Sequence, residues 1–306
     1  MKKLTALLLA LMLLVPAFAF ADEAEYATIT IGATPSPHVE ILEAIEPQLE
    51  AVGIKLNIIT YTDYIQPNDA LVAGDLDANF FQHKPYMDDY NLGHGSNLVA
   101  LIPVHYEPLG IYPGKTATIE ELPEGGSIAV PNDTTNEARA LLLLEANGII
   151  TLREGAGINA TKLDIVDNPK NIEIQEVEAA QIPRVLPDVD LAVINGNYAV
   201  QAGLNVMTDA LVKEESDSLA AETYVNYVVV NDGNYDADLF AKLQQVLTSD
   251  ETKAWMNEKY AGAVVPFEPT TDEATDEAAD TATDETASTD EAAAATEEPA
   301  DEATEG

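Results

Sequence analysis

Apolar residues between positions 27 and 268 follow two spacings, one typical of buried strands and one typical of amphipathic helices. Residues 27–32 (ATITIG) form a short apolar run that predicts a buried strand. Ser36 is placed to cap the following helix, with Pro37 at its first position and Gly53 just beyond its end. Further strands are predicted around Leu56 and Ile58 and at residues 78–82, 98–104, 127–130, 172–177 and 191–194.

Most of these strands are separated by segments with helical spacing, which predicts α/β architecture with largely parallel sheets. The patterned region is long enough for two lobes. In open α/β sheets the ligand binds beyond the carboxyl ends of the strands. Residues that follow directly after strands are therefore the first candidates for function.

The first 21 residues have the pattern of a secretory signal peptide. Lysines at positions 2 and 3 precede an apolar run at residues 4–15, and residues 19–21 supply a small-x-small cleavage site. The run is well short of the roughly 20 residues that span a bilayer, which disfavours a retained anchor. We expect cleavage before Asp22 and an exported, soluble protein in the periplasm or at the cell exterior.

Acidic residues outnumber basic ones by 54 to 14, and 14 of the acids lie within residues 270–306, which contain no Lys or Arg. A surface with this excess of acidic residues repels phosphate backbones and anionic lipids. We therefore expect no nucleic-acid partner. Residues 269–306 consist mainly of Thr, Asp, Glu and Ala and are predicted to form a disordered tail that ligand binding does not need. An Ala/Glu-rich helix is the alternative, disfavoured by the many Thr and Asp residues.

Sequence signatures of catalysis and of metal binding are missing. The chain has no cysteine, which excludes disulfides, thiolate chemistry and a cysteine-linked lipid anchor. Residues 155–160 match a dinucleotide-binding fingerprint in their glycines, but no strand precedes them and no clear helix follows. The four histidines lack metal-ligand spacing. We therefore predict no catalytic residue, no cofactor and no metal.

The strongest local pattern for chemistry is at residues 130–144, where a strand ends and a helix begins. Thr134 and Glu137 are spaced as a capping box, and Asn136 and Arg139 share one face of the first helical turn. A helix N-terminus attracts anions, and the Arg139 guanidinium is a fork that matches a carboxylate. The alternative is an ordinary surface ion pair between Arg139 and a nearby acid.

Two other clusters could complete a small-ligand site. Residues 61–68 and 79–86 bring aromatic rings and His83 to a strand-to-helix transition, as in an aromatic-lined slot. Either Phe80 or Phe81 could instead be ordinary core. Asn197 follows another strand, where a purely structural turn is the alternative, and Asn226 interrupts an apolar strand and needs a polar partner.

Taken together, these segments resemble the NlpA-type methionine-binding lipoproteins, the substrate receptors of methionine ABC importers. The resemblance extends from residue 27 to about residue 267. The matching stretches are residues 32–38 (GATPSPH), 63–68 (DYIQPN), 81–83 (FQH), 85–86 (PY), 130–133 (VPND), 136–139 (NEAR), 193–199 (VINGNYA) and 259–266 (KYAGAVVP).

The resemblance implies a two-lobed periplasmic-binding-protein fold, type II-like, with the ligand in the cleft between the lobes. The first lobe would comprise residues 22–107 and 222–268, and the second residues 108–221. A monomer would capture methionine and deliver it to a membrane permease. The chain departs from the family in lacking the lipid-anchor cysteine and in carrying the acidic tail.

The resemblance also assigns roles to individual residues. Arg139 would grip the ligand carboxylate. For the ligand-free protein we expect an open and wetted cleft, in which Arg139 contributes little to folding. The polar end of the ligand would be hydrogen-bonded by Asn136, Asn197 and Asn226. The side-chain slot, which suits a soft thioether, would be lined by Tyr64, Phe81, His83 and Tyr86.

Three alternatives remain open at this stage. The ligand could be another small amino acid or a short peptide. The protein could be an exported enzyme on a similar scaffold, although no nucleophile-base pair is found near the expected cleft. It could also be a surface interaction protein that uses its acidic tail.

Overall fold

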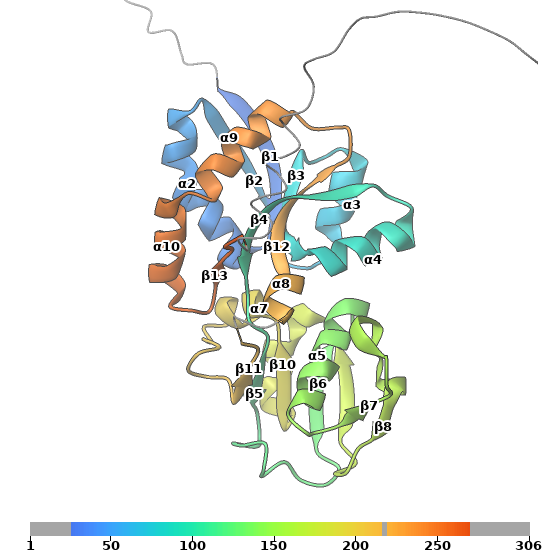
Figure 1. The fold of residues 1–306 in the computed structure, drawn as a ribbon. Helices are drawn as coiled ribbons and strands as arrows, with labels where there is room; N and C mark the ends of the chain where they lie inside the picture. The colour runs from blue at the N-terminus through green and yellow to red at the C-terminus, as the bar shows by residue number, and fades with distance from the viewer. Residues whose placement is uncertain (1–25, 216–218, 270–306) are drawn as a thin grey trace, which may run out of the picture. The chain divides into compact units, whose positions relative to one another are not determined.

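The computed structural model describes residues 26–215 and 219–269, which build two β-sheets with their flanking helices (Figure 1). The predicted signal peptide and nearly all of the predicted acidic tail lie outside the described residues. Within the described residues no helix is long and apolar enough to cross a membrane. Described residues up to Phe267 belong to one compact unit.

The first sheet has six strands in the order β13-β4-β12-β3-β1-β2. Its N-terminal strands β1 (Ala27–Ala33), β2 (Ile54–Thr60) and β3 (Ala78–His83) are parallel to one another. In contrast, β12 (Val225–Asn231) is antiparallel to both β3 and β4 (Leu98–Tyr106), and the short β13 (Val265–Pro266) is antiparallel to β4.

Helices cover both faces of this sheet (Figure 1). On one face are α2 (Glu40–Ala51), α9 (Ala237–Leu247) and α10 (Asp250–Tyr260), and on the other are α3 (Gln66–Ala73) and α4 (Lys84–His94). The predicted helix after Ser36 begins with a π-helical turn, η2 (Pro35–Val39), and continues as α2. The Ser36 hydroxyl donates to the Glu40 carboxylate, and no side-chain cap of this turn is formed.

The second sheet has five strands in the order β11-β5-β10-β6-β9. Its centre, β10 (Leu191–Ile194), is parallel to β6 (Ser127–Pro131), which is parallel to β9 (Glu173–Val177). The strands β5 (Gly110–Pro113) and β11 (Val212–Lys213) run antiparallel to their neighbours. The main helix of this part is α5 (Thr134–Ala146); α6 (Ile182–Val185), α7 (Gly196–Gln201) and the small ribbon of β7 (Thr151–Leu152) and β8 (Ile165–Asp167) complete it.

The chain passes between the two sheets twice. The first crossover is residues 107–109, between β4 and β5, and the second lies between β11 and β12 and includes the short helix α8 (Leu219–Thr223). Every predicted strand is present, but the expectation of largely parallel sheets is wrong for about half of each sheet. The reason is topological: strands that enter or leave at a crossover run against their neighbours. The exact lobe boundaries stay a prediction.

A buried amide network fixes the start of α3 against β3. The Asn79 amide donates to the Pro67 carbonyl oxygen at 3.1 Å and to Asn68 Oδ1 at 2.8 Å, while Gln82 Nε2 donates to Asn79 Oδ1 at 2.9 Å. Asn68 Nδ2 donates to Gln82 Oε1 at 2.9 Å. Asn68 and Asn79 are fully buried. Because buried amides need partners, this network holds the strand that carries Phe81 and His83.

We predict that Asn79→Ala destabilises the fold, because it leaves buried partners unpaired at a cost of about 1–3 kcal/mol each. The free energy of unfolding in urea measures this cost. Asn57→Ala, which removes an exposed amide from β2, is the control and should change stability by no more than about 0.5 kcal/mol. Equal effects of the two substitutions would show that the network does not hold α3 on β3.

Candidate functional site

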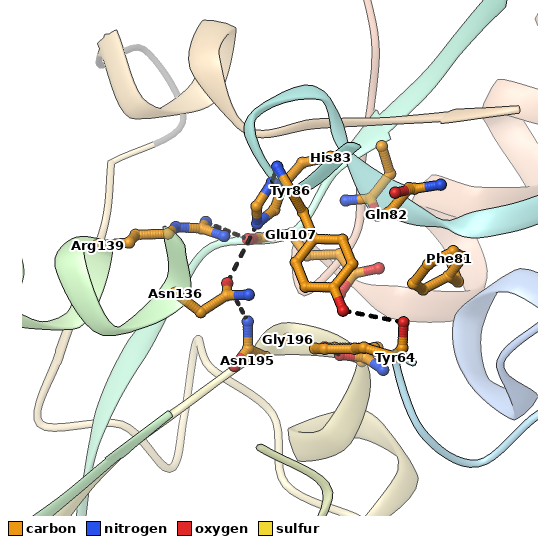
Figure 2. Close-up of a pocket in the computed structure, with 12 residues that line it drawn as sticks. Tyr64, Phe81, Gln82, His83, Tyr86, Glu107, Asn136, Arg139, Asn195 and Gly196 are labelled. Atoms are coloured by element: carbon orange, nitrogen blue, oxygen red, sulfur yellow. Dashed lines mark hydrogen bonds between the residues drawn. The ribbon is translucent and has the colours of Figure 1, made fainter. Parts of the chain in front are cut away.

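A small pocket lies where the carboxyl ends of strands from both sheets meet the first crossover (Figure 2). The structure places all eight sequence-predicted site residues around it. The pocket is lined by Tyr64, Phe81, Gln82, His83, Tyr86, Glu107, Asn136, Arg139, Asn195, Gly196, Asn197 and Asn226. Sequence reasoning did not assign Gln82, Glu107, Asn195 or Gly196 to the site. That the eight predicted residues bind a ligand stays a prediction.

The polar end of the pocket is built on the N-terminus of α5. Asp133 is the N-cap residue, and its Oδ1 accepts the backbone N–H of Asn136 at 3.0 Å. The predicted capping box of Thr134 and Glu137 is therefore wrong by one position, since Thr134 is already helical and Glu137 accepts the backbone N–H of Lys162. Asp133 also accepts Asn136 Nδ2 at 2.8 Å, so the cap aims the Asn136 side chain.

His83 spans the pocket from the first sheet to α5. Its Nδ1 accepts the backbone N–H of Tyr86 at 3.2 Å and thereby caps α4, which leaves the proton on Nε2, 3.1 Å from Asn136 Oδ1. Burial, reinforced by the charge of Arg139, lowers the pKa of His83 to about 3. His83 is therefore a neutral donor that fixes Asn136, whose Oδ1 also accepts Asn195 Nδ2 at 2.7 Å.

Aromatic rings form the other end of the pocket. The ring centroids of Tyr64, Phe81 and Tyr86 are 5.8–5.9 Å apart in every pairing. The Tyr86 hydroxyl donates to the Tyr64 carbonyl oxygen at 3.0 Å (Figure 2). Phe81 belongs to this slot, whereas Phe80 is fully buried core that contacts the His38 ring. This arrangement is the aromatic slot that the sequence pattern predicts.

Direct contacts join the two sides of the pocket in this structure. The Tyr64 hydroxyl donates to Asn197 Oδ1 at 2.5 Å, and the rings of Tyr64 and Tyr198 lie 4.9 Å apart. The Tyr198 hydroxyl donates to the Thr62 carbonyl oxygen at 3.4 Å. Side chains from the two sheets therefore bridge the pocket in this structure, and the open, wetted cleft expected of the ligand-free protein stays a prediction.

Arg139 pairs with Glu214 of the second crossover. Its Nε donates to Glu214 Oε1 at 2.9 Å and its Nη2 to Oε2 at 2.5 Å, while Nη2 also donates to the Glu107 carbonyl oxygen at 2.9 Å. Glu214 additionally accepts the Tyr106 hydroxyl and the Leu109 backbone N–H. Burial alone would raise the pKa of Glu214, but Arg139 and these hydrogen bonds lower it overall.

This pairing corrects the expectation that Arg139 contributes little to folding. Arg139 is only 4% exposed, and its Nε–Nη2 edge is matched to a protein carboxylate. The alternative of an ion pair with a nearby acid is thus partly right, although the pair is buried rather than on the surface. The hydrogen bonds to Glu214 and to the Glu107 carbonyl oxygen engage Nε and Nη2 of Arg139 and do not involve Nη1.

A buried acid-histidine cluster lies beneath the pocket, formed by His38, His105 and Glu107. Glu107 Oε1 is 2.8 Å from His105 Nε2 and 3.5 Å from His38 Nε2. His38 Nε2 is also 3.3 Å from Asn226 Oδ1, which supplies the polar partner that Asn226 needs. Burial lowers the pKa of both histidines to about 3 and raises the pKa of Glu107.

The ligand atoms of these three side chains lie within 4.8 Å of one another, close enough in principle to hold a metal ion. Sequence spacing did not reveal this cluster, because His38 and His105 come from distant segments that the sheet brings together. The His105–Glu107 distance is that of a direct hydrogen bond, so the groups already satisfy one another. The arrangement therefore favours hydrogen bonding within the cluster over a metal site.

Among the described residues, two buried amide atoms of the pocket lining have no hydrogen-bond partner: Asn195 Oδ1 and Asn197 Nδ2. Unpaired buried polar groups are rare and call for an explanation. Both residues belong to the 195–197 segment that follows β10, where the sequence left a structural turn open as an alternative. One spare acceptor and one spare donor at the same wall indicate that this segment is arranged to receive a polar ligand.

Comparison with known proteins identifies the relatives of the chain. A profile of the family described as NlpA lipoprotein matches residues 29–268. The membrane lipoprotein TpN32 of Treponema pallidum is 42% identical over 241 residues, which cover 78% of this chain and 87% of that protein. The D-methionine-binding lipoprotein MetQ of Salmonella typhimurium is 40% identical over 247 residues, or 80% of this chain and 90% of that protein.

Solved structures show the same similarity. A nutrient-binding protein from Burkholderia cenocepacia, bound to methionine, has 40% identity and a TM-score of 0.74 and covers 78% of this chain and all 100% of its own. An ABC transporter periplasmic substrate-binding protein from Coxiella burnetii has 38% identity and a TM-score of 0.73, with coverage of 78% and 100%. The two-lobed binding-protein fold expected from the sequence is thus confirmed.

We predict that Arg139→Ala lowers the free energy of unfolding by about 3–5 kcal/mol, because it strands the buried Glu214 carboxylate. Urea unfolding without added amino acids measures the loss. The matched control is Arg153→Ala, which breaks the ion pair of an exposed arginine with Asp164 and should cost about 0–1 kcal/mol. A small loss for Arg139→Ala would mean that Glu214 finds water or another donor.

A second prediction concerns pH. His105 has a pKa of about 3 in the fold and 6.5 when unfolded, so a proton is taken up only on unfolding. The free energy of unfolding should therefore fall as the pH drops from about 6.5 toward 3, by up to about 1.4 kcal/mol per pH unit for this residue. His105→Gln should unfold with a visibly shallower dependence on pH.

Urea midpoints between pH 7.5 and 5, compared between His105→Gln and wild type, test this. Glu107 acts in the opposite direction, since a raised carboxyl pKa favours the fold as the pH falls. The difference between variants is therefore decisive, and parallel curves for His105→Gln and wild type would contradict a neutral, buried His105.

Proposed function

Because the chain belongs to the NlpA lipoprotein family, we propose that it is the extracytoplasmic solute-binding protein of an ABC importer and that its ligand is methionine. It captures the amino acid between its lobes and delivers it to a permease in the membrane. The proposal rests on one observation above all: residues from both sheets build a single pocket with aromatic rings at one end and polar groups at the other.

The names of the relatives support this ligand. One curated relative is called a D-methionine-binding lipoprotein, and one structural neighbour has methionine bound. Another neighbour is described as a periplasmic substrate-binding protein of an ABC transporter. Because these proteins are about 40% identical to this chain over most of its length, we propose the same role, methionine binding for an ABC transporter, for this chain.

The division of labour within the pocket supports an amino acid with an apolar side chain. Tyr64, Phe81 and Tyr86 supply rings against which a polarizable thioether packs well. On the opposite side, Asn136 and the Nη1 group of Arg139 are placed for a carboxylate, with Asn197 and Asn226 beside them. His83 holds Asn136 in place.

The alternatives of the sequence analysis differ in what supports them. Another small amino acid or a short peptide would use the same polar end, so only a binding panel decides between them. An enzyme would need a reactive nucleophile, whereas the pocket offers amides, rings, a paired arginine and a buried carboxylate; we infer that ligand leaves unchanged. A role as a surface interaction protein has no support beyond the acidic tail.

We infer further that the protein acts as a monomer with the permease as its partner. The two curated relatives named above are described as lipoproteins, whereas the 306-residue sequence contains no cysteine to accept a lipid. We therefore propose an exported chain without a cysteine-linked anchor, held near the membrane through the permease.

Calorimetric titration of the purified protein tests the ligand. We expect saturable binding of methionine and at least tenfold weaker binding of leucine, glutamate and glycine, with methionine recovered unchanged by mass spectrometry. Phe81→Leu should weaken methionine binding by about 2- to 12-fold, the loss of one sulfur–aromatic contact. Phe240→Leu, the same substitution in the core of the first sheet, should leave affinity unchanged. No binding of methionine to the wild type would refute the proposed ligand.

A further inference from the structure

Glu107 places an acidic side chain in the wall of the pocket, and the cation that acts on it, Arg139, is already paired with Glu214. The carboxylate lies on the first crossover, is 5% exposed and lines the pocket. Its histidine neighbours are held neutral by burial, and Arg139 is matched by Glu214. An isolated buried charge is costly unless a cation or hydrogen-bond donors compensate it.

The groups around Glu107 are arranged as donors toward an anion. His38 Nε2 faces only acceptors, Asn226 Oδ1 and Glu107 Oε1, so this nitrogen carries the proton. His105 Nε2 lies 2.8 Å from the same oxygen, and its Nδ1 has no partner, as expected if the proton is on Nε2. The backbone N–H of Asn197 adds a further hydrogen bond. Neutral donors thus orient the carboxylate without cancelling its charge.

The side chain of Glu107 borders the wall that has unpaired polar atoms. A Cβ on Gly196 would lie 2.6 Å from Glu107 Cβ and 2.9 Å from its Oε2, so only glycine permits this approach. The neighbouring Asn195 is 5% exposed and its Oδ1 is an acceptor without a donor. The Glu107 carboxyl group and Asn195 Oδ1 therefore lie on one wall of the polar end of the pocket, where Asn197 Nδ2 is a donor without a partner among the described residues.

Such a pocket matches a zwitterion. We propose that Glu107 is the counter-ion of the ligand's α-ammonium group and that Asn195 Oδ1 is a second acceptor for it, so that the site selects for a free amino group. This rests on the proposed function, in that the ligand is an amino acid. Glu107 then sets specificity, and His38 and His105 are positioning residues that act through it.

The experiment compares methionine with 4-(methylthio)butanoate, the same molecule without its amino group. Wild type should bind methionine about thirty-fold or more tighter, the low end of what an unpaired buried charge costs. Glu107→Gln keeps the shape and removes the charge, and should lose that preference by weakening methionine binding while leaving the analogue as before or better. Glu178→Gln removes an exposed carboxylate of a neighbouring cavity and should keep the wild-type preference.

The possible outcomes distinguish a failure of the counter-ion role of Glu107 from a failure of the proposed methionine-binding function. If wild type binds neither compound, the proposed function fails. If wild type binds both with equal affinity, or if Glu107→Gln weakens both equally, methionine binding stands and the counter-ion role is overturned. Should Glu107→Gln fail to fold in a thermal melt, the wild-type preference for methionine over the analogue still decides the question.

Discussion

The pairing of Arg139 with Glu214 is the interaction on which the site depends, because it joins the two crossovers to the helix that carries the polar end of the pocket. Glu214 belongs to the second crossover, while the Glu107 carbonyl oxygen and the Leu109 amide belong to the first. One buried ion pair thus sets where α5 stands relative to both connections between the sheets. Buried ion pairs make a small net contribution to stability in many proteins, but removing one of the two partners is strongly destabilising.

The ion pair also determines what charge the pocket presents. The Nε–Nη2 edge of Arg139 is hydrogen-bonded to Glu214. This edge is therefore not available for a bidentate contact with a ligand carboxylate. Neutral amides must therefore share that work, and four asparagines line the pocket. Because Arg139 is already paired with Glu214, the proposed counter-ion role of Glu107 makes a ligand with a positive group a better fit than a simple anion.

Features of the fold and the pocket that depend on contacts between residues close in sequence can be predicted from the sequence, whereas those that depend on contacts between distant residues cannot. Strand positions, the Phe81 slot and the Asn136–Arg139 face depend on local spacing, and the sequence pattern predicts them correctly. The sequence pattern does not identify the cap at Asp133, because Asp133 and Thr134 are both good cap residues and backbone conformation decides between them. The Glu214 partner of Arg139, 75 residues away, and the His38–His105–Glu107 cluster depend on tertiary pairing, which no spacing reveals.

The two ends of the pocket belong to different sheets, and this has a consequence for how a ligand is held. The rings come from the segment before α3, from β3 and from α4, whereas Asn136, Arg139, Asn195 and Asn197 come from α5 and the end of β10. A molecule with only an apolar chain, or only a polar head, satisfies one side. An amino acid with a long apolar side chain satisfies both and so bridges the sheets. The contacts that discriminate between ligands are then the same contacts that hold the two sides of the pocket together.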